Sequence, residues 1–396
     1  MLINSSKIIY IIGSQSIIED MPKISSFPPF DNPIIDYLSD ISKHLLANSN
    51  AKSYPDIITF AFWCRRSNLL KLMKSYNDTS DRLGRGIIFH IAPSNVAVNF
   101  AYSLVAGLLA GNSNILRLPS KYFPQVDIIC EAFKCSLNNF IKPHICLVKY
   151  DHSEKVITDH FSKICDSRIV WGGDLTISEI RKSPLKARAT EITFADRYSI
   201  FVINADSYLD APDKDQIAQA FYNDTYLTDQ NACTSPFIVI WMGANILEAQ
   251  EIFWGKLYSL VKSKFTIQPS HIIDKTTNSY IFASTHSSIK IKNSHDNLIL
   301  RVIINNIDHL LPSFKGNCGY FYEYAAKDLS ELLPLCSDKC QTLSYYGINK
   351  SELYDFIRYT KPRGIDRIVP VGRTMDFSLI WDGYDLIRSL SRIITY

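Results

Sequence analysis

"GIIFHIAPSN", residues 86–95, decides the fold of this chain. It opens with a short apolar, β-branched run and ends in a Pro-Ser-Asn triplet, which is typical of a strand followed by a turn. The next stretch, "VNFAYSLVAGLLAGN" (98–112), has a helix-forming composition and closes on a glycine and an asparagine. "SNILRLP" (113–119) then predicts a second strand, and "QVDIICEAFKCSL" (125–137) a second helix. This alternation predicts βαβ units built on a parallel sheet.

The same alternation continues along the chain. "ICLVKY" (145–150) and "RIVWGG" (168–173) predict further strands of the first half. "YSIFVINAD" (198–206) and "PFIVIWMG" (236–243) predict strands of the second half, and "LILRVII" (298–304) predicts an edge strand. Helical sequence separates most of these runs. The expected fold class is therefore α/β.

Composition places the chain among ordinary globular proteins. Of 396 residues, 46% are hydrophobic and 20% are charged, and the formal net charge is +3. No block of lysine and arginine indicates a nucleic-acid partner. The longest uncharged stretch, 96–115, is interrupted by Asn99, Asn112 and Asn114, which favours a buried helix and turn over a membrane span.

The N-terminus and the cysteines predict a cytoplasmic protein. "MLINSSKIIYIIGSQ" (1–15) has only a short apolar run and no small-residue cleavage site, so a signal peptide is not expected. Nine scattered cysteines in a chain of this size indicate reduced thiols. Cys336 and Cys340 are four residues apart, but no second pair has a zinc-like spacing, so no metal site is expected.

Neither of the common glycine-rich phosphate motifs occurs in the first half. There is no G-x-G-x-x-G and no G-x-x-x-x-G-K-[ST]. A dinucleotide can still bind at the carboxyl ends of parallel strands. Three predicted strand ends carry polar or glycine residues suited to that role: "APSN" (92–95), "RLPSK" (117–121) and "WGGD" (171–174).

Two stretches carry a family resemblance. "HIAPSNVAVNFAYSLVAGLLAGNSNILRLPSKYFPQVDII" (90–129) and "GRTMDFSLIWDGYDLIRSLSR" (372–392) resemble the Lux-type acyl-CoA reductases, the fatty-acid reductases of bacterial luminescence. More distantly, the order of motifs from about 85 to 390 resembles the aldehyde dehydrogenase superfamily. That order is a Pro-x-Asn turn, a basic strand end, a glycine pair, a glutamate segment and a cysteine.

The resemblance implies an aldehyde dehydrogenase-like fold. It implies a Rossmann-type, NADP(H)-binding domain over 1–203 and an α/β catalytic domain over 204–370 that carries the nucleophilic cysteine. Residues 371–396 would return to the cofactor domain or to a partner subunit. The sequence before Gly86 shows no long hairpin of the kind that this superfamily uses for pairing, so a homo-oligomer is left open.

Cys233, in "DQNACTSPF" (229–237), matches the nucleophile of the resembled family. Taken alone it reads as a buried thiol, since cysteine is among the most buried residue types. Polar neighbours and the order of the motifs favour the nucleophile instead. Asn95 reads either as a helix N-cap or, by resemblance, as an oxyanion donor that acts together with the Cys233 N–H.

The other site residues are assigned by the same resemblance. Arg117, Ser120 and Lys121 would contact the adenosine ribose and its phosphate, unless they simply form a solvated strand end. This end carries cations and no carboxylate, which favours NADPH over NADH. Gly172-Gly173 reads as a tight turn or as a place where backbone approaches the cofactor.

Glu191 matches the superfamily's glutamate weakly, because "TEITFADRY" (190–198) lacks the glycine pair that normally follows it. A structural role is therefore favoured over an acid/base role.

The implied activity is NADPH-dependent reduction of an acyl-CoA, or another activated acyl thioester, to the aldehyde in fatty acid metabolism. The reaction would pass through an acyl-cysteine thioester, with an acyl-protein synthetase or transferase as a partner by resemblance only. One alternative is an aldehyde dehydrogenase that oxidises an aldehyde to the acid or to acyl-CoA. Another is a non-catalytic acyl-binding or scaffold protein that keeps the fold.

Overall fold

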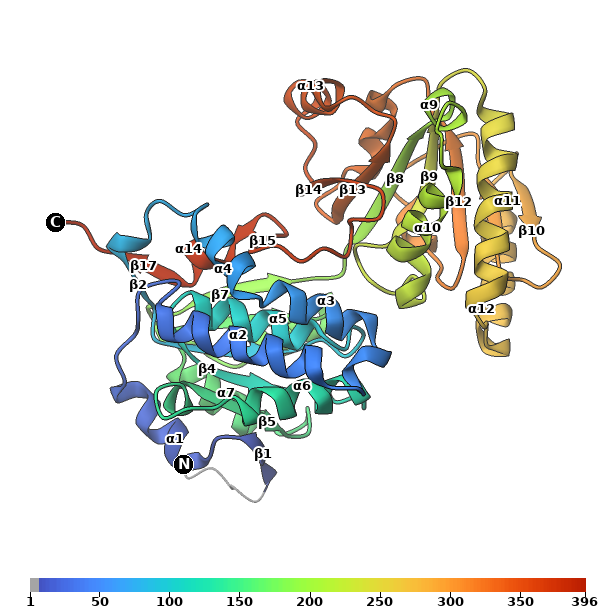
Figure 1. The fold of residues 1–396 in the computed structure, drawn as a ribbon. Helices are drawn as coiled ribbons and strands as arrows, with labels where there is room; N and C mark the ends of the chain where they lie inside the picture. Colours follow the sequence, from blue (N-terminus) through green and yellow to red (C-terminus); the bar gives the residue numbers. More distant parts are fainter. Residues whose placement is uncertain (1–6) are drawn as a thin grey trace. The chain divides into compact units, whose positions relative to one another are not determined.

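The computed structural model describes residues 7–396, which divide into two compact units (Figure 1). Unit 1 comprises the described residues up to Ala195 together with Ser378–Tyr396, and unit 2 comprises Asp196–Phe377. The first six residues of the stretch considered above for a signal peptide lie outside the described residues. No helix between residues 7 and 396 has the length and apolar character needed to cross a bilayer.

Unit 1 is built on a six-stranded sheet with helices on both faces. The strands of unit 1, which include those of two further two-stranded sheets, are β1 (Ile9–Ile12), β2 (Arg82–Gly84), β3 (Ile87–Ile91), β4 (Ser113–Arg117), β5 (Ile145–Lys149), β6 (Ser167–Trp171), β7 (Thr190–Phe194), β15 (Ile380–Trp381), β16 (Tyr384–Asp385) and β17 (Ser391–Ile393). Its α-helices are α1 (Gln15–Asp20), α2 (Asn32–Ala47), α3 (Pro55–Trp63), α4 (Arg66–Met73), α5 (Asn99–Leu109), α6 (Pro124–Cys135), α7 (Lys155–Ile164), α8 (Asp174–Arg181) and α14 (Leu386–Ser389). Its 3-10 helices are η2 (Met21–Lys23), η3 (Ala51–Ser53), η4 (Thr79–Asp81) and η5 (Lys142–His144).

The strand order of this sheet is β1-β5-β4-β3-β6-β7. All neighbours are parallel except β1, which runs antiparallel to β5. From β3 the chain builds outward through β4 and β5 on one side, and then through β6 and β7 on the other. This is the doubly wound, Rossmann-type arrangement, and it creates a switch point between β3 and β6.

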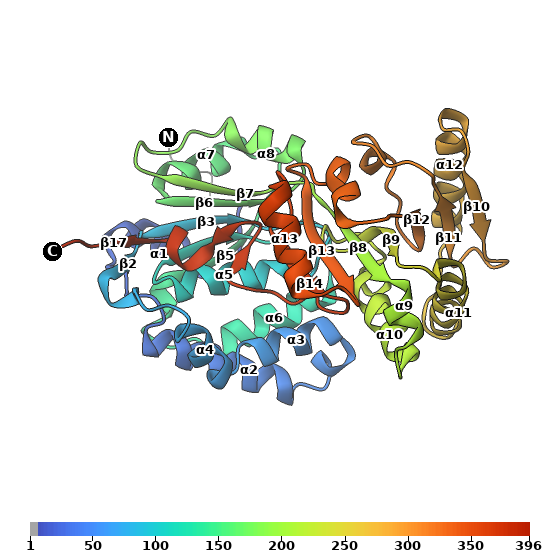
Figure 2. The same ribbon diagram turned by 90° about the horizontal axis from the view of Figure 1, so that it is seen from above.

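The residues of β3 show why helices cover both faces. All five are buried, and alternate side chains of a strand point to opposite faces. Ile87, Phe89 and Ile91 pack in one apolar cluster with side chains of α7 and α8. His90 points to the other face, toward Ser103 of α5. Figure 2 shows α7 and α8 on one side of the sheet and α5 and α6 on the other, with α2 and α3 outside them.

Of the C-terminal residues 371–396, only Ser378–Tyr396 belong to unit 1, and the residues up to Phe377 belong to unit 2. Strand β17 pairs antiparallel with β2, so the end of the chain shares a small sheet with residues 82–84. Arg388 of α14 donates to Asp78 at 2.9 Å and to Asp385 at 2.8 Å. Hydrogen bonds from Arg388 and Arg82 lower the pKa of the Asp78 carboxyl. These contacts fasten the tail to the helical region before β2.

Unit 2 has its own seven-stranded sheet. Its strands are β8 (Tyr198–Asn204), β9 (Pro236–Met242), β10 (Lys290–Asn293), β11 (Leu300–Ile303), β12 (Tyr320–Ala325), β13 (Cys340–Tyr346) and β14 (Arg367–Pro370). Its α-helices are α9 (Ala205–Leu209), α10 (Lys214–Thr225), α11 (Ile246–Lys264), α12 (Pro269–Thr285) and α13 (Lys350–Thr360). Its 3-10 helices are η6 (Tyr226–Thr228), η7 (Leu311–Phe314) and η8 (Leu329–Leu335).

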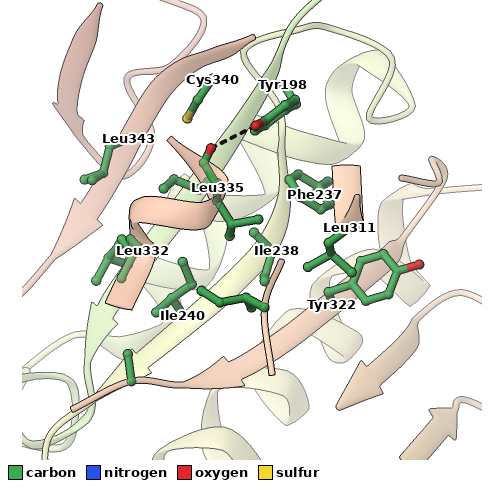
Figure 3. Packing of buried hydrophobic residues seen from close by; sticks show 14 of the residues in the cluster. Tyr198, Phe237, Ile238, Ile240, Leu311, Tyr322, Leu332, Leu335, Cys340 and Leu343 are labelled. Atoms are coloured by element: carbon green, nitrogen blue, oxygen red, sulfur yellow. Dashed lines mark hydrogen bonds between the residues drawn. The ribbon is translucent and has the colours of Figure 1, made fainter. Parts of the chain in front are cut away.

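The strand order is β10-β11-β12-β9-β8-β13-β14, and only β10 is antiparallel to its neighbour. Every residue of β9 is buried, because helices cover both faces of this sheet too. Ile238 and Ile240 pack against Leu335 of η8 on one face, where Tyr198 also donates a hydrogen bond to the Leu335 carbonyl (Figure 3). Trp241 packs against α11 on the opposite face.

The structure confirms the α/β alternation predicted for the first half and corrects two details of the second. The chain leaves the first sheet at Ala195, before the boundary expected after residue 203, because β8 pairs with β9 and β13. The prediction that 298–304 forms an edge strand is wrong: β11 lies inside the sheet, and β10 covers it. Among described residues before Gly86, β1 and β2 pair with distant strands and no hairpin forms.

Candidate active site

The turns after β3 and β6 lie on either side of the switch point of the first sheet. Pro93-Ser94-Asn95 follows β3, and Gly172-Gly173 follows β6. Strands β3 and β6 are adjacent and parallel, so both turns lie at the carboxyl edge of the sheet. In doubly wound sheets, ligands bind in the crevice at this place. The structure thus brings these two predicted segments to one edge.

The turns after β3 and β4 are in contact. The hydroxyl oxygens of Ser94 and Ser120 are 3.3 Å apart, and both residues are exposed. Asn95 is also exposed, but helix α5 begins only at Asn99, with Val98 as its N-cap. The alternative in which Asn95 caps this helix is therefore wrong, and Asn95 stands in the turn itself.

Two cations mark the end of β4. The guanidinium of Arg117 lies 4.7 Å from the ring centre of Tyr150, and the Lys121 ammonium lies 5.2 Å from that of Phe123. Contacts of this kind place a cation over an aromatic face while its charge remains available to a ligand. No carboxylate occurs between residues 113 and 123, but Asp151 after β5 lies near enough to Arg117 to interact with it electrostatically.

Gly173 leaves an open space where α8 begins. It is the N-cap of that helix, with φ −66° and ψ 165°, a backbone conformation open to any residue. A Cβ placed on Gly173 would meet no atom within 4 Å, whereas one on Gly172 would lie 3.1 Å from Thr176. Helix N-termini attract anions, although Asp174 in the first turn opposes a negative charge there. Gly173 therefore leaves room for a ligand group beside the turn.

A buried hydrogen-bond chain supports the end of β6. Trp171 Nε1 lies 3.0 Å from Ser103 Oγ, which lies 2.8 Å from His90 Nδ1. His90 Nε2 lies 2.9 Å from Asn114 Oδ1. Burial lowers the pKa of His90 to about 4, so the imidazole is neutral at physiological pH. This histidine orients neighbouring strands and Trp171, the residue before the glycine pair.

Glu191 lies at the opposite end of the strands. It is opposite Arg168 near the amino ends of β6 and β7. Its carboxylate accepts hydrogen bonds from Arg168 Nε at 2.8 Å and from Arg181 Nε at 2.7 Å. Burial acts to raise its pKa, but the two guanidinium groups together hold the pKa below the usual value. Engaged in this way and away from the ligand edge, the glutamate is placed for a structural role.

Cys233 belongs to unit 2, in the turn that precedes β9. Its side chain is half-buried, between Ala232 and Thr234, which are buried. The Ser199 hydroxyl donates to the Cys233 carbonyl at 2.7 Å, which attaches the turn to the start of β8. Thr234 Oγ1 donates to Met375 Sδ at 3.1 Å.

Cys233 differs from the other cysteines in its surroundings. All nine fall among the described residues, and none forms a disulfide. Seven are buried, and burial raises the thiol pKa of five of them, namely Cys64, Cys130, Cys146, Cys165 and Cys318. Cys135 is exposed, but its hydrogen bond to Glu131 raises its pKa. A raised pKa disfavours the reactive thiolate at each of these six positions.

Two residues that hold the Cys233 turn were not predicted from the sequence. Gln230 is buried three residues upstream, and Asp224 is fully buried in α10. The signal for Gln230 was present, since a polar amide next to a candidate nucleophile has to find partners when buried. Within residues 7–396, no cluster of histidine, cysteine or carboxylate side chains is arranged to hold a metal ion.

A family model decides the identity of the chain. The model of the family described as "Acyl-CoA reductase (LuxC)" matches residues 46–396. The chain belongs to this acyl-CoA reductase family. It is therefore an aldehyde-related oxidoreductase, and the resemblance stated from residues 90–129 and 372–392 is confirmed. No curated protein matches the chain.

Solved structures give the fold of this LuxC-family chain. It is similar to lactaldehyde dehydrogenase from Escherichia coli, with a TM-score of 0.67 and 12% identity over 94% of this chain and 87% of that one. A benzaldehyde dehydrogenase from Corynebacterium glutamicum, described as NAD-dependent, gives a TM-score of 0.64 and 14% identity over 95% and 86%. A 1-pyrroline-5-carboxylate dehydrogenase from Thermus, with bound NAD, gives 0.65 and 10% over 96% and 83%. The predicted aldehyde dehydrogenase-like fold is confirmed.

Proposed function

We propose that this LuxC-family protein reduces an acyl-CoA to the aldehyde through a thioester on Cys233, with NADPH as the reductant. Unit 1 would hold the cofactor, and unit 2 would carry the nucleophile. One observation carries the proposal. Cys233 is a half-buried thiol in a polar turn whose backbone is tied to β8, whereas seven other cysteines are buried and Cys135 is hydrogen-bonded to a carboxylate.

The first step is an acyl transfer. The Cys233 thiolate attacks the carbonyl carbon of the acyl-CoA, a new C–S bond forms, and the bond to the CoA sulfur breaks. CoA leaves as its thiolate, so atoms and charge balance without a separate base once Cys233 is ionised. The acyl group then remains on Cys233 as a thioester.

A dinucleotide fits the carboxyl edge of the first sheet. When bound there, NADPH supplies the hydride that reduces the acyl carbon. Gly173 leaves room for the pyrophosphate at the start of α8, and Gly172 avoids a close contact with Thr176. Arg117, Lys121 and Ser120 are the residues that would hold the adenosine ribose, and their charge favours the 2′-phosphate of NADPH over the free hydroxyl of NADH.

The remaining groups stabilise charge and limit hydrolysis. The Cys233 N–H and the Asn95 side chain are the proposed donors to the oxyanion of the thiohemiacetal, each contributing roughly 3 kcal/mol. Collapse of that intermediate releases the aldehyde and the Cys233 thiolate. The two carboxylate oxygens of Glu191 accept hydrogen bonds from Arg168 and Arg181, and this engagement makes the glutamate a poor base for activating water. This arrangement favours aldehyde formation over oxidation to the acid.

The test follows the acyl group and the cofactor separately. Acyl-CoAs of graded chain length are mixed with NADPH or NADH, while the absorbance of the cofactor and the mass of the intact protein are recorded. Omitting the cofactor should trap an acyl adduct, and peptide mapping should place it on Cys233. Cys233→Ala should abolish the adduct and the turnover, whereas Cys135→Ser, the matched control on the exposed thiol, should retain both.

Other outcomes would overturn the proposal. Turnover by Cys233→Ala would exclude the covalent mechanism. Formation of NADPH from NADP⁺ and an aldehyde, with no reverse reaction from acyl-CoA, would favour an aldehyde dehydrogenase. Acyl binding without an adduct or cofactor consumption would favour a non-catalytic role.

A further inference from the structure

The turn before Cys233 has an unusual backbone. Asp229 and Gln230 are consecutive, neither is glycine, and both have positive φ, 51° and 59°. Left-handed backbone is unfavourable for residues with a Cβ, and it persists where surrounding contacts enforce it. Such conformations cluster at sites where geometry matters for function. Surrounding contacts must therefore hold Asp229 and Gln230 in this conformation.

The Gln230 side chain supplies most of them. Its Nε2 donates to the carbonyls of Pro236 and Tyr320, both at 3.0 Å. Its Oε1 accepts from the backbone N–H groups of Gly319 at 3.1 Å and Tyr320 at 3.2 Å. Both amide hydrogens and both lone pairs are thus used, as burial to 7% exposure requires. One side chain joins the start of β9 to the start of β12.

The hydrogen bond to Pro236 closes the loop that carries Cys233. Gln230 and Pro236 are the two ends of the segment 230–236, and Cys233 is its middle residue. The Gln230 backbone N–H donates to the Thr225 carbonyl at 2.8 Å, which fixes the first end to α10. Pro236 begins β9, which fixes the second end. The Gln230 amide therefore fixes the distance between the two ends of the Cys233 turn.

The residues before β12 that bind the Gln230 amide are themselves held in place. Cys318 N–H donates to the Asp229 carbonyl at 2.9 Å, so the loop before β12 lies against the turn. Lys275 of α12, only 2% exposed, donates to the carbonyls of Cys318 at 2.8 Å and Asn297 at 2.6 Å. A buried lysine therefore holds the segment before β12, to which the Gln230 side chain is hydrogen-bonded.

We infer that Gln230 is a positioning residue for acyl transfer: its amide holds segment 230–236 so that the Cys233 thiol and N–H face the reacting carbonyl together. The inference rests on the proposed function of Cys233. Gln230 touches neither substrate nor cofactor, and it acts through the backbone of the loop. Misplacement of a nucleophile by about 1 Å costs on the order of 100-fold in rate. We expect a loss of that size when the amide is removed.

The experiment compares two reactions of the same thiol. Acylation of Cys233 by acyl-CoA needs the thiol and the oxyanion donor to face the same carbonyl group. Alkylation by iodoacetamide needs only the thiolate. Gln230→Ala and Gln230→Glu should slow acylation about 100-fold, while alkylation at Cys233 falls less than about 10-fold and the Kd for NADPH stays unchanged. Gln250→Ala, a matched glutamine of α11 with 8% exposure, should leave all three as in the wild type.

Gln230→Glu also gives a pH signature. The substitution keeps the shape of the side chain, and a protonated carboxyl restores one donor toward the two carbonyls. Its acylation rate, relative to that of the wild type, should therefore recover as the pH falls. A purely structural role would instead lower acylation and alkylation by the same factor at every pH.

The outcomes separate this inference from the proposed function. If Gln230→Ala and Gln230→Glu are acylated at Cys233 as fast as the wild type, the inference is overturned and the proposed function stands. Turnover by Cys233→Ala would overturn the proposed function. If Gln230→Ala fails to fold, the isosteric Gln230→Glu and the shorter amide Gln230→Asn still decide the question, because each retains polar atoms in the buried position.

Discussion

The Asp224 carboxylate accepts a hydrogen bond of 2.6 Å from the backbone N–H of Gly372, 148 residues further along the chain. Its other oxygen accepts from the N–H of Thr374 at 3.1 Å. The next residue, Met375, accepts a hydrogen bond from Thr234, the neighbour of Cys233. A single buried carboxylate therefore attaches the 372–375 turn beside the candidate nucleophile to helix α10.

This relationship predicts a dependence of stability on pH. Burial raises the pKa of Asp224 from 3.8 to about 6, against the lowering effect of its two backbone donors. The folded state thus binds this proton more tightly than the unfolded chain. The stabilisation is fully present below pH 3.8 and is lost as the pH rises through about 6. Its size is roughly 3 kcal/mol, since one pKa unit corresponds to about 1.4 kcal/mol.

Asp224→Asn should remove this pH dependence. Between pH 4 and pH 7 the free energy of unfolding of the variant, measured by urea titration, should rise relative to that of the wild type by roughly 3 kcal/mol. Asp215→Asn, an exposed residue of the same helix, is the control and should show no such change. Parallel curves for Asp224→Asn and the wild type across this range would contradict the assignment.

Local sequence patterns made the first sheet predictable, whereas the hydrogen bonds of Gln230 and Asp224 around the Cys233 turn depend on residues distant in the sequence. Residues 86–119 carry their own strand, turn and helix patterns, and β3, α5 and β4 formed where these patterns predicted them. The partner of Asp224 is set by how the chain returns after β14, which no local pattern encodes. Likewise, the arginines of Glu191 are identified only by the pairing of β6 with β7 and the position of α8.

Gly173 offers a direct test of where the cofactor binds. Gly173→Val should weaken NADPH binding at least about 10-fold, because its side chain would enter the open space at the start of α8. The free energy of unfolding should change by less than about 0.5 kcal/mol, since the backbone conformation suits valine. Fluorescence titration of NADPH and thermal unfolding measure the two effects.

Gly255 is the matched control for this substitution. It lies on an exposed part of α11, and a Cβ there also meets no atom within 4 Å. Gly255→Ala should stabilise the protein by about 0.5–1 kcal/mol and leave NADPH binding unchanged. Tight binding of NADPH by Gly173→Val would place the pyrophosphate elsewhere.

The structural role given to Glu191 predicts that its loss lowers stability without changing the chemistry. Glu191→Gln leaves the guanidinium of Arg168, only 2% exposed, without its charge partner, and should lower the free energy of unfolding by about 3 kcal/mol. At temperatures where the variant is folded, its pH–rate profile should match that of the wild type. Glu179→Gln, in an exposed pair with Lys182, should cost less than about 1 kcal/mol. A reduced kcat with unchanged stability would instead make Glu191 an acid/base group.

Thiol labelling should single out Cys233 in the native protein. The seven buried cysteines should resist iodoacetamide, because the reagent does not reach a buried thiol. Cys233 and the exposed Cys135 should react, and unfolding should raise the number of labelled thiols to all nine. Prior incubation with acyl-CoA should protect Cys233 and leave Cys135 as reactive as before. Labelling of Cys233 unaffected by acyl-CoA would show that the acyl group does not reside on Cys233, and equal protection of both thiols would show non-specific acylation.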